Sequence, residues 1–370
     1  MRVPAHGAPI GKRPMARTSI RTLRLNAGAT ARALESFGNV GTEIDALAAP
    51  LGRSPKSVLM THGTLQLVHF RARTDSVYRV PLLMVSSIIN QPTVLDLMPG
   101  QSMVEFLLDA GFDVYMVEWG RPRREHASLT LADHVLDKLP ACIARVLEHS
   151  GERDLSVVGY CLGGLLSVLY ASLHEHTALK NLVCIATPVD SDGLASFKAW
   201  MGPHFDEEGL LQQYGNVPAE WMQTAMRALR PFGKTAGALQ LLNQVGQAEA
   251  VRSNLHMGKW EMDNIPMAGG VFRELVRDFL RANRLVQGTW TIGGLHAKPS
   301  RINASALHLV AREDHIVPYA ASRPLLDLLV GSRDKEEIII KGGHVGLVTG
   351  RGALTRMWPA LVHWLAPRSV

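Results

Sequence analysis

Cysteine is scarce in this chain of 370 residues, which holds only Cys142, Cys161 and Cys184. An odd and sparse set does not build a disulfide framework. No CxxC or HExxH motif indicates zinc or another metal, and we expect no cofactor. No uncharged apolar stretch reaches about 18 residues, so we expect no transmembrane segment. Cys142 and Cys184 lie in apolar patterns and are expected to be inert core residues, which leaves Cys161 as the thiol of interest.

Acidic residues are missing from the first 34 positions, which hold seven basic residues. The rest of the chain holds 32 basic and 33 acidic residues, so the net charge of +6 belongs to this N-terminal arm. An arm of this kind is either a solvated tail or a contact for an anionic surface or nucleic acid. We favour the tail and expect no nucleic-acid partner. The arm also lacks the apolar segment of a secretory signal.

Strand-like and helix-like segments alternate along most of the remaining chain. Residues 63–73 alternate like a strand, and apolar runs typical of buried strands occur at 80–90, 112–119, 155–160, 182–187, 305–311 and 336–340. Helical spacing occurs at 102–111, 130–151, 162–176, 319–330 and 353–365. The alternation predicts an α/β-hydrolase fold, with a mostly parallel sheet and helices on both faces.

The alternation stops between residues 188 and 296, where only helical patterns are found. We interpret this segment as a helical lid inserted into the core. The predicted organisation is therefore a basic arm and helix over 1–57, core over 58–187, lid over 188–296, and core again over 297–370.

The sequence GYCLGG at 159–164 places Cys161 between a predicted strand and a predicted helix. This is the context of a nucleophile elbow, G-x-S-x-G, with cysteine in place of serine. Cys161 would lie at the positive end of the helix, where a thiolate is favoured. The backbone N–H of Leu162 would face a developing oxyanion. A second donor is expected from the loop after residues 81–85, where Ser87 and Ile88 are the nearest candidates.

The partners of such a nucleophile follow later strands, in the order acid and then histidine. Asp314 comes just after the strand at 305–311, and His344 comes just after the strand at 336–340. We therefore predict a triad of Cys161, His344 and Asp314. Glu313 and Asp192 are the alternative acids. His315 is interpreted as a loop residue with local hydrogen bonds, although roles as a second base or in substrate binding stay open.

A thiol in this position favours one kind of chemistry. A cysteine that attacks a thioester exchanges one thioester for another at little cost in free energy, so the acyl group stays activated for transfer to a hydroxyl. An apolar lid would keep water from taking that group. The pattern favours acyl transfer, but cysteine hydrolases exist and hydrolysis stays open.

Long stretches of the chain resemble the catalytic subunit of poly(3-hydroxyalkanoate) synthases, in particular the short two-subunit kinds. The resemblance covers about residues 55 to 365 and is carried by INQPTVLDLMPGQSMVEFLLDAGFDVYMVEWGRP (89–122), GYCLGG, YGNVPAEWM (214–222), KWEMDNIPMAGGVFRELVRDFLRANRLVQG (259–288), AREDHIVP (311–318) and GGHVG (342–346). It implies that Cys161 carries the growing polyester as a thioester, that His344 deprotonates Cys161, and that Asp314 supports His344 or helps activate the incoming hydroxyl.

The resemblance also implies the substrates and partners. The substrates would be (R)-3-hydroxyacyl-CoA molecules, short-chain ones such as 3-hydroxybutyryl-CoA by default, and the products polyester and free coenzyme A. A small accessory subunit, a homodimer and the surface of cytoplasmic polyester granules are the implied partners. Trp260 and Asp263 match the family's lid motif, where packing and a substrate-channel role are equally open.

Three other readings compete with this one. A dienelactone-hydrolase-like enzyme shares the cysteine elbow, but that family is much shorter and has no such lid. A polyester depolymerase or thioesterase on the same fold would differ only in the fate of the acyl-enzyme. A scaffold that coats granules would not need the predicted triad.

Overall fold

The computed structural model describes residues 51–174, 178–229 and 248–370. The helix predicted within the N-terminal arm lies outside these residues. In the described part of the chain, no helix has the length and apolarity needed to cross a bilayer.

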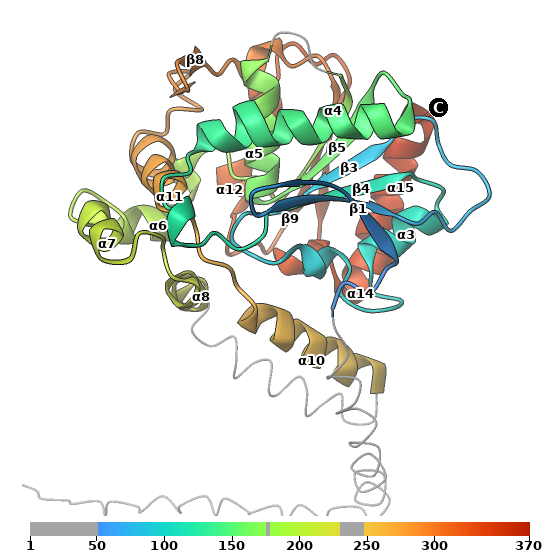
Figure 1. The fold of residues 1–370 in the computed structure, drawn as a ribbon, viewed down its shortest axis with the longest axis horizontal. Helices are drawn as coiled ribbons and strands as arrows, with labels where there is room; N and C mark the ends of the chain where they lie inside the picture. The colour runs from blue at the N-terminus through green and yellow to red at the C-terminus, as the bar shows by residue number, and fades with distance from the viewer. Residues whose placement is uncertain (1–50, 175–177, 230–247) are drawn as a thin grey trace, which may run out of the picture.

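Eight strands form one sheet in the order β1-β2-β4-β3-β5-β6-β9-β10 (Figure 1). Their bounds are β1 Lys56–His62, β2 Leu65–Phe70, β3 Leu82–Val85, β4 Val114–Glu118, β5 Leu155–Tyr160, β6 Leu179–Ile185, β9 Ser305–Ala311 and β10 Lys335–Ile340. The pairs β1–β2 and β2–β4 are antiparallel, and every other neighbouring pair is parallel. Parallel strands have their carboxyl ends at one edge, so the loops that follow them can assemble a site there.

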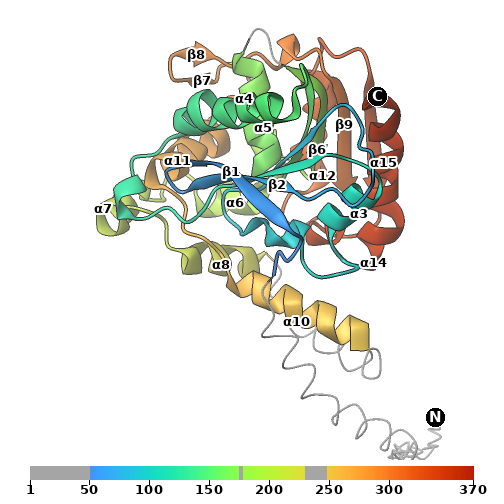
Figure 2. The ribbon, with the colours of Figure 1, turned by 45° about the vertical axis from the view of Figure 1, so that its right-hand side comes forward.

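The central strands are buried on both faces. Every residue of β3 and β5 is buried, which explains their nearly continuous apolar sequences LLMV and LSVVGY. Helices cover the sheet from both sides: α4 (Leu139–Ser150) and α5 (Leu162–Leu173) lie on one face, and α3 (Met103–Asp109) and α15 (Trp358–Leu365) lie on the other (Figure 2).

Shorter helices complete the core. They are η1 Pro92–Leu95, η2 Arg124–His126, η3 Asp133–Lys138, η6 Pro299–Arg301, α12 Tyr319–Ser322, α13 Leu325–Leu328, η7 Val345–Leu347, α14 Gly350–Gly352, η8 Ala353–Met357 and η9 Ala366–Arg368.

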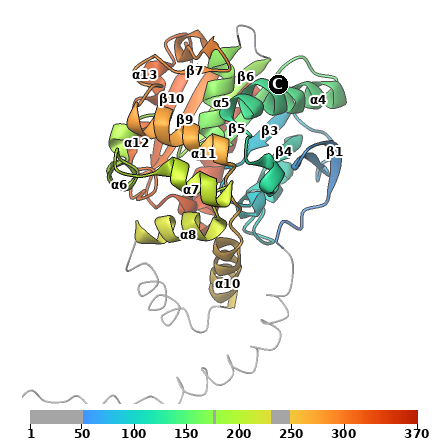
Figure 3. The same ribbon diagram turned by 60° about the vertical axis from the view of Figure 1, so that its left-hand side comes forward.

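Between β6 and β9 the chain leaves the sheet and forms a mainly helical segment (Figure 3). Its elements are η4 Ser191–Gly193, α6 Ala195–Trp200, α7 Glu207–Tyr214, α8 Ala219–Ala228, α10 Ala248–Met262, α11 Gly269–Glu274, η5 Leu275–Arg281, β7 Thr291–Ile292 and β8 Leu295–His296. We call this segment the lid. The lid boundaries proposed from the sequence stay a prediction.

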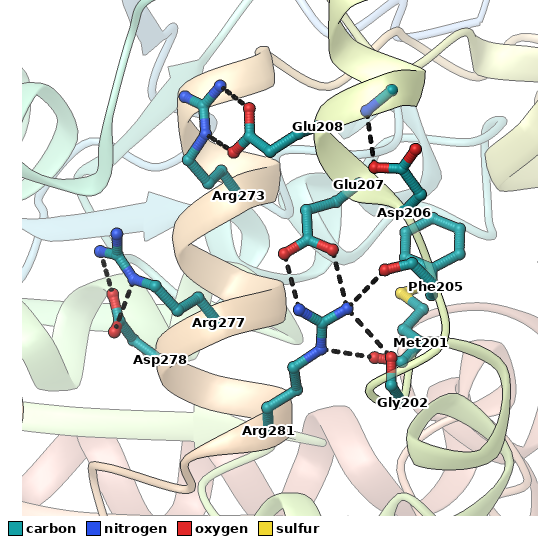
Figure 4. A network of polar contacts seen from close by, with 11 residues as sticks. Met201, Gly202, Phe205, Asp206, Glu207, Glu208, Arg273, Arg277, Asp278 and Arg281 are labelled. Atoms are coloured by element: carbon teal, nitrogen blue, oxygen red, sulfur yellow. Dashed lines mark hydrogen bonds and ion pairs between the residues drawn. The ribbon is translucent and has the colours of Figure 1, made fainter.

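A charged network joins two parts of the lid (Figure 4). The guanidinium of Arg281, at the end of η5, binds both carboxylate oxygens of Glu207 at 2.6 and 2.7 Å. It also donates to the carbonyl oxygens of Met201, Gly202 and Phe205. Because one half-buried side chain satisfies four partners, it fixes the turn between α6 and α7 against η5.

Three features differ from the sequence prediction. The short antiparallel pair β7–β8 lies in the segment 188–296, where only helical patterns were found in the sequence. Strand β1 was not predicted, because its mostly exposed sequence KSVLMTH carries no clear apolar alternation. The helix predicted over 319–330 is divided into α12 and α13. Pro324 lies between them, and a proline interrupts the backbone hydrogen bonds of a helix.

Candidate active site

Cys161 lies in a sharp turn between β5 and α5. Its backbone has φ of +54° and ψ of −123°, a conformation that non-glycine residues rarely adopt. Its N–H donates to the carbonyl of Ile185, and its own carbonyl accepts from Gly164. The turn therefore presents the side chain at the carboxyl edge of the sheet, at the N-terminus of α5.

Three glycines make this turn possible. A Cβ on Gly159 would lie 2.5 Å from the Cα of Gly164, and a Cβ on Gly163 would lie 2.1 Å from the carbonyl oxygen of Val85. A Cβ on Gly164 would lie 1.9 Å from the hydroxyl oxygen of Thr187. Each contact is closer than real atoms allow, so glycine is required for α5 to pack against the ends of β3 and β6.

The structure brings Asp314 and His344 together at the same edge. Asp314 follows β9 and His344 follows β10, and His344 Nδ1 lies 2.7 Å from Asp314 Oδ2. The other carboxylate oxygen accepts the backbone N–H groups of Ile316 and Val317, at 2.9 and 2.8 Å. The carboxylate is thus held in one orientation, and it selects the tautomer of His344 that has its proton on Nδ1.

The imidazole of His344 also lies near Cys161, and the two side chains interact electrostatically. Burial alone lowers the pKa of His344, but the Cys161 thiolate and the Asp314 carboxylate raise it, and they bring the pKa to about 10. The imidazole therefore holds a proton in the neutral range when the thiolate is beside it. The ring of Tyr160 packs against the imidazole, with 5.2 Å between the ring centroids.

An apolar cavity lined by Cys161 opens between the core and the lid. Core residues such as Leu162 and Val317 form its floor, and Met222, Met226 and Phe279 of the lid contribute to its walls. Every lining side chain other than Cys161 is apolar, so the cavity suits an acyl chain and provides no charged group to bind a phosphate.

The backbone groups proposed for the oxyanion lie beside the elbow. In the described chain, the N–H groups of Leu162, Ser87 and Ile88 donate to no backbone carbonyl. A Cβ built on Gly163 would lie 2.1 Å from the carbonyl oxygen of Val85 and 2.5 Å from that of Ser86, so the loop after β3 borders the turn. We define residues 86–91 as the oxyanion loop. Its donors stay a prediction.

Other residues named from the sequence lie outside this constellation. Glu313 binds the backbone N–H of Gly342, and exposed Asp192 pairs with Lys198. Neither is bound to His344. His315 follows Asp314 and is half-buried, and it does not line the cavity. Trp260 does not line the cavity either: it is buried, and its indole N–H donates to the carbonyl of Gln91 at 2.9 Å.

The other two cysteines are core residues. Burial raises the pKa of the thiols of Cys142 and Cys184 to about 12. In the residues that the structure describes, no group of three or more potential metal ligands occurs. Sequence reasoning missed the ring of Tyr160 against His344. Its position beside the nucleophile in GYCLGG is the signal that could have found it.

Comparisons with known proteins identify the fold and the family. A family model described as alpha/beta hydrolase fold matches residues 81–350, so the predicted fold class is confirmed. A soluble variant of monoglyceride lipase from Saccharomyces cerevisiae has a similar structure, with a TM-score of 0.53 and 13% sequence identity, over 88% of this chain and 98% of the lipase. At that identity the likeness concerns the fold alone.

A second family model, described as the N-terminus of poly-beta-hydroxybutyrate polymerase (PhaC), matches residues 39–107. The poly(3-hydroxyalkanoate) polymerase subunit PhaC of Allochromatium vinosum is 31% identical over 331 residues, which cover 88% of this chain and 92% of that protein. The protein of the same name from Haloferax mediterranei is 32% identical over 86% of this chain, and the match spans 65% of its length.

Proposed function

Because the chain belongs to the PhaC family of poly(3-hydroxyalkanoate) polymerase subunits, we propose that it is an acyltransferase that joins (R)-3-hydroxyacyl groups from coenzyme A thioesters into a polyester. The observation that carries the proposal is that Asp314 is hydrogen-bonded to His344, and that His344 interacts electrostatically with Cys161, which lines an apolar cavity.

The first half of the reaction loads the enzyme. The Cys161 thiolate attacks the thioester carbonyl, and the negative charge on oxygen is stabilised by the N–H of Leu162 and a donor of the oxyanion loop. The carbon–sulfur bond to coenzyme A breaks, and the imidazolium of His344 gives its proton to the leaving thiolate. One thioester replaces another, so little free energy is lost.

The second half extends the chain. The 3-hydroxyl of another acyl unit attacks the Cys161 thioester, and His344 takes the hydroxyl proton. An ester bond forms, the bond to the Cys161 sulfur breaks, and the thiolate–imidazolium pair returns. Asp314 stabilises the positive charge on His344 in both halves. Water would give hydrolysis at the same step, and the apolar cavity wall disfavours its entry.

Partners and location follow from the same proposal. The relatives are named as subunits of a polymerase. We propose that this chain also works with a small accessory subunit. We also propose that two copies of this chain form a homodimer, and that the enzyme acts at the surface of polyester granules in the cytoplasm. Gel filtration with light scattering, and localisation of a fluorescent fusion in cells that accumulate polyester, test these two statements.

The activity is tested by supplying 3-hydroxybutyryl-CoA, with and without the accessory subunit from the same cell. We expect release of coenzyme A together with turbidity from polymer. Cys161→Ala should abolish both, and Cys161→Ser should retain a feeble activity because a serine hydroxyl ionises far less readily. Release of coenzyme A with only free 3-hydroxybutyrate would instead establish a hydrolase. A folded protein that releases none under any condition would favour a scaffold.

A further inference from the structure

The two ends of the oxyanion loop are held by different parts of the molecule. At its start, the indole N–H of Trp119 donates to the carbonyl of Ser86 at 2.9 Å, and the Ser86 hydroxyl donates to the carbonyl of Val117 at 3.0 Å. Both partners belong to β4 and the residue after it, so this end is fixed to the core sheet.

The other end is held by the lid. The indole N–H of Trp260, near the end of α10, donates to the carbonyl of Gln91. The amide of Asn90 donates to the side-chain oxygen of Asn264 at 2.7 Å, and the two residues pair as an isolated antiparallel bridge.

The lid segment 260–265 has its own anchor to the core. Exposed Arg121, in the loop after β4, donates to the carbonyl of Asn264 at 3.0 Å and forms an ion pair with Asp263. The segment is therefore held between Arg121 and the oxyanion loop. Trp260 is 5% exposed, so its indole N–H must be bonded to avoid the cost of an unpaired buried donor.

We infer that Trp260 and Asn264 are positioning residues, which hold the oxyanion loop in place through Gln91 and Asn90. The loop lies between a fixed end at Ser86 and an end that belongs to the lid. The position of the lid therefore sets the position of the backbone donor at Ser87 or Ile88. This inference rests on the proposed use of that loop to stabilise an oxyanion, and it gives Trp260 a role other than lining the substrate channel.

Two reactions of Cys161 separate this role from a structural one. Acylation by p-nitrophenyl butyrate passes through an oxyanion, whereas alkylation by iodoacetamide is a displacement that forms none. Both need the thiolate of Cys161 and a route for the reagent to reach it. We expect Trp260→Phe and Asn264→Ala to lower the single-turnover rate of acylation about tenfold and to leave the alkylation rate within about twofold, because displacing one donor weakens only the oxyanion step.

Gln223→Ala is the matched control. Gln223 of α8 donates to the carbonyl of Glu261, so the variant removes a contact of the same lid segment that does not reach the oxyanion loop. It should leave both rates unchanged. A parallel fall of both rates in Trp260→Phe and Asn264→Ala, or no change in either, would overturn the inference.

The comparison of acylation with alkylation can be interpreted whether or not the protein polymerises its substrate. If coenzyme A thioesters are not polymerised but the ratio of acylation to alkylation still falls, the positioning role stands and the proposed function fails. A wild-type protein that is alkylated but never acylated would overturn the role of the loop, and this inference with it.

Discussion

The imidazole of His344 and the carboxylate of Asp314 are joined by a hydrogen bond of 2.7 Å, although the residues are 30 positions apart and follow different strands. Asp314→Asn keeps the size of the side chain but removes its charge. Its amide can donate to His344 Nδ1 and so favour the wrong tautomer. We expect the rate of coenzyme A release to fall about a thousandfold. The matched variant Glu313→Gln should retain most of the activity, and equal losses in both variants would contradict the assignment of the acid.

The reactivity of Cys161 should depend on pH in a specific way. The pKa of His344 is raised to about 10, so the imidazole stays protonated through the neutral range and its charge favours the thiolate. We expect alkylation by iodoacetamide at neutral pH to be faster in the wild type than in His344→Gln, because only the wild type has the imidazolium beside the sulfur. In His344→Gln the rate should rise with pH around 8.5, as for an ordinary thiol. Peptide mass spectrometry identifies the alkylated residue, and identical pH profiles would exclude the ion pair.

Glycine at position 163 should be essential for folding. In Gly163→Ala the new Cβ would meet two backbone oxygens, of Val85 and Ser86, at 2.1 and 2.5 Å. Backbone atoms of the central sheet cannot move aside cheaply, so we expect a lower melting temperature or insoluble protein. Gly346→Ala is the control, because nothing lies within 4 Å of a Cβ built there. Thermal unfolding of the two variants decides the matter, and a wild-type melting temperature for Gly163→Ala would refute the packing argument.

The network around Arg281 should stabilise the lid more than a neighbouring ion pair does. Arg281→Ala leaves three carbonyl groups and Glu207 without their donor, and we expect the free energy of unfolding to fall by about 2 kcal/mol. Arg273→Ala removes a more exposed pair with Glu208 and should cost less than about 1 kcal/mol. Urea denaturation measures both, and limited proteolysis should cut the lid of Arg281→Ala first. Equal effects of the two variants would be evidence against the network.

The order of apolar runs was sufficient to predict most of the sheet and to place three side chains near one another. Cys161, Asp314 and His344 each come just after such a run, and parallel strands end at one edge. The bond from Trp260 to Gln91 spans 169 positions and could not be predicted in this way. It depends on how the lid returns to the core, and no local pattern encodes that path. From the sequence alone, packing within the lid and a position in the substrate channel were equally compatible with Trp260.

The apolar wall of the cavity affects how a growing polyester chain can move along it. Met222, Met226 and Phe279 provide surface but no hydrogen-bonding groups that could fix one repeat unit at a particular depth. A chain of identical ester units can then advance by one unit after each addition without breaking any directed bond to the protein. If the product moves along this wall, the reaction at the sulfur, and not the transport of the product, would determine the duration of each cycle.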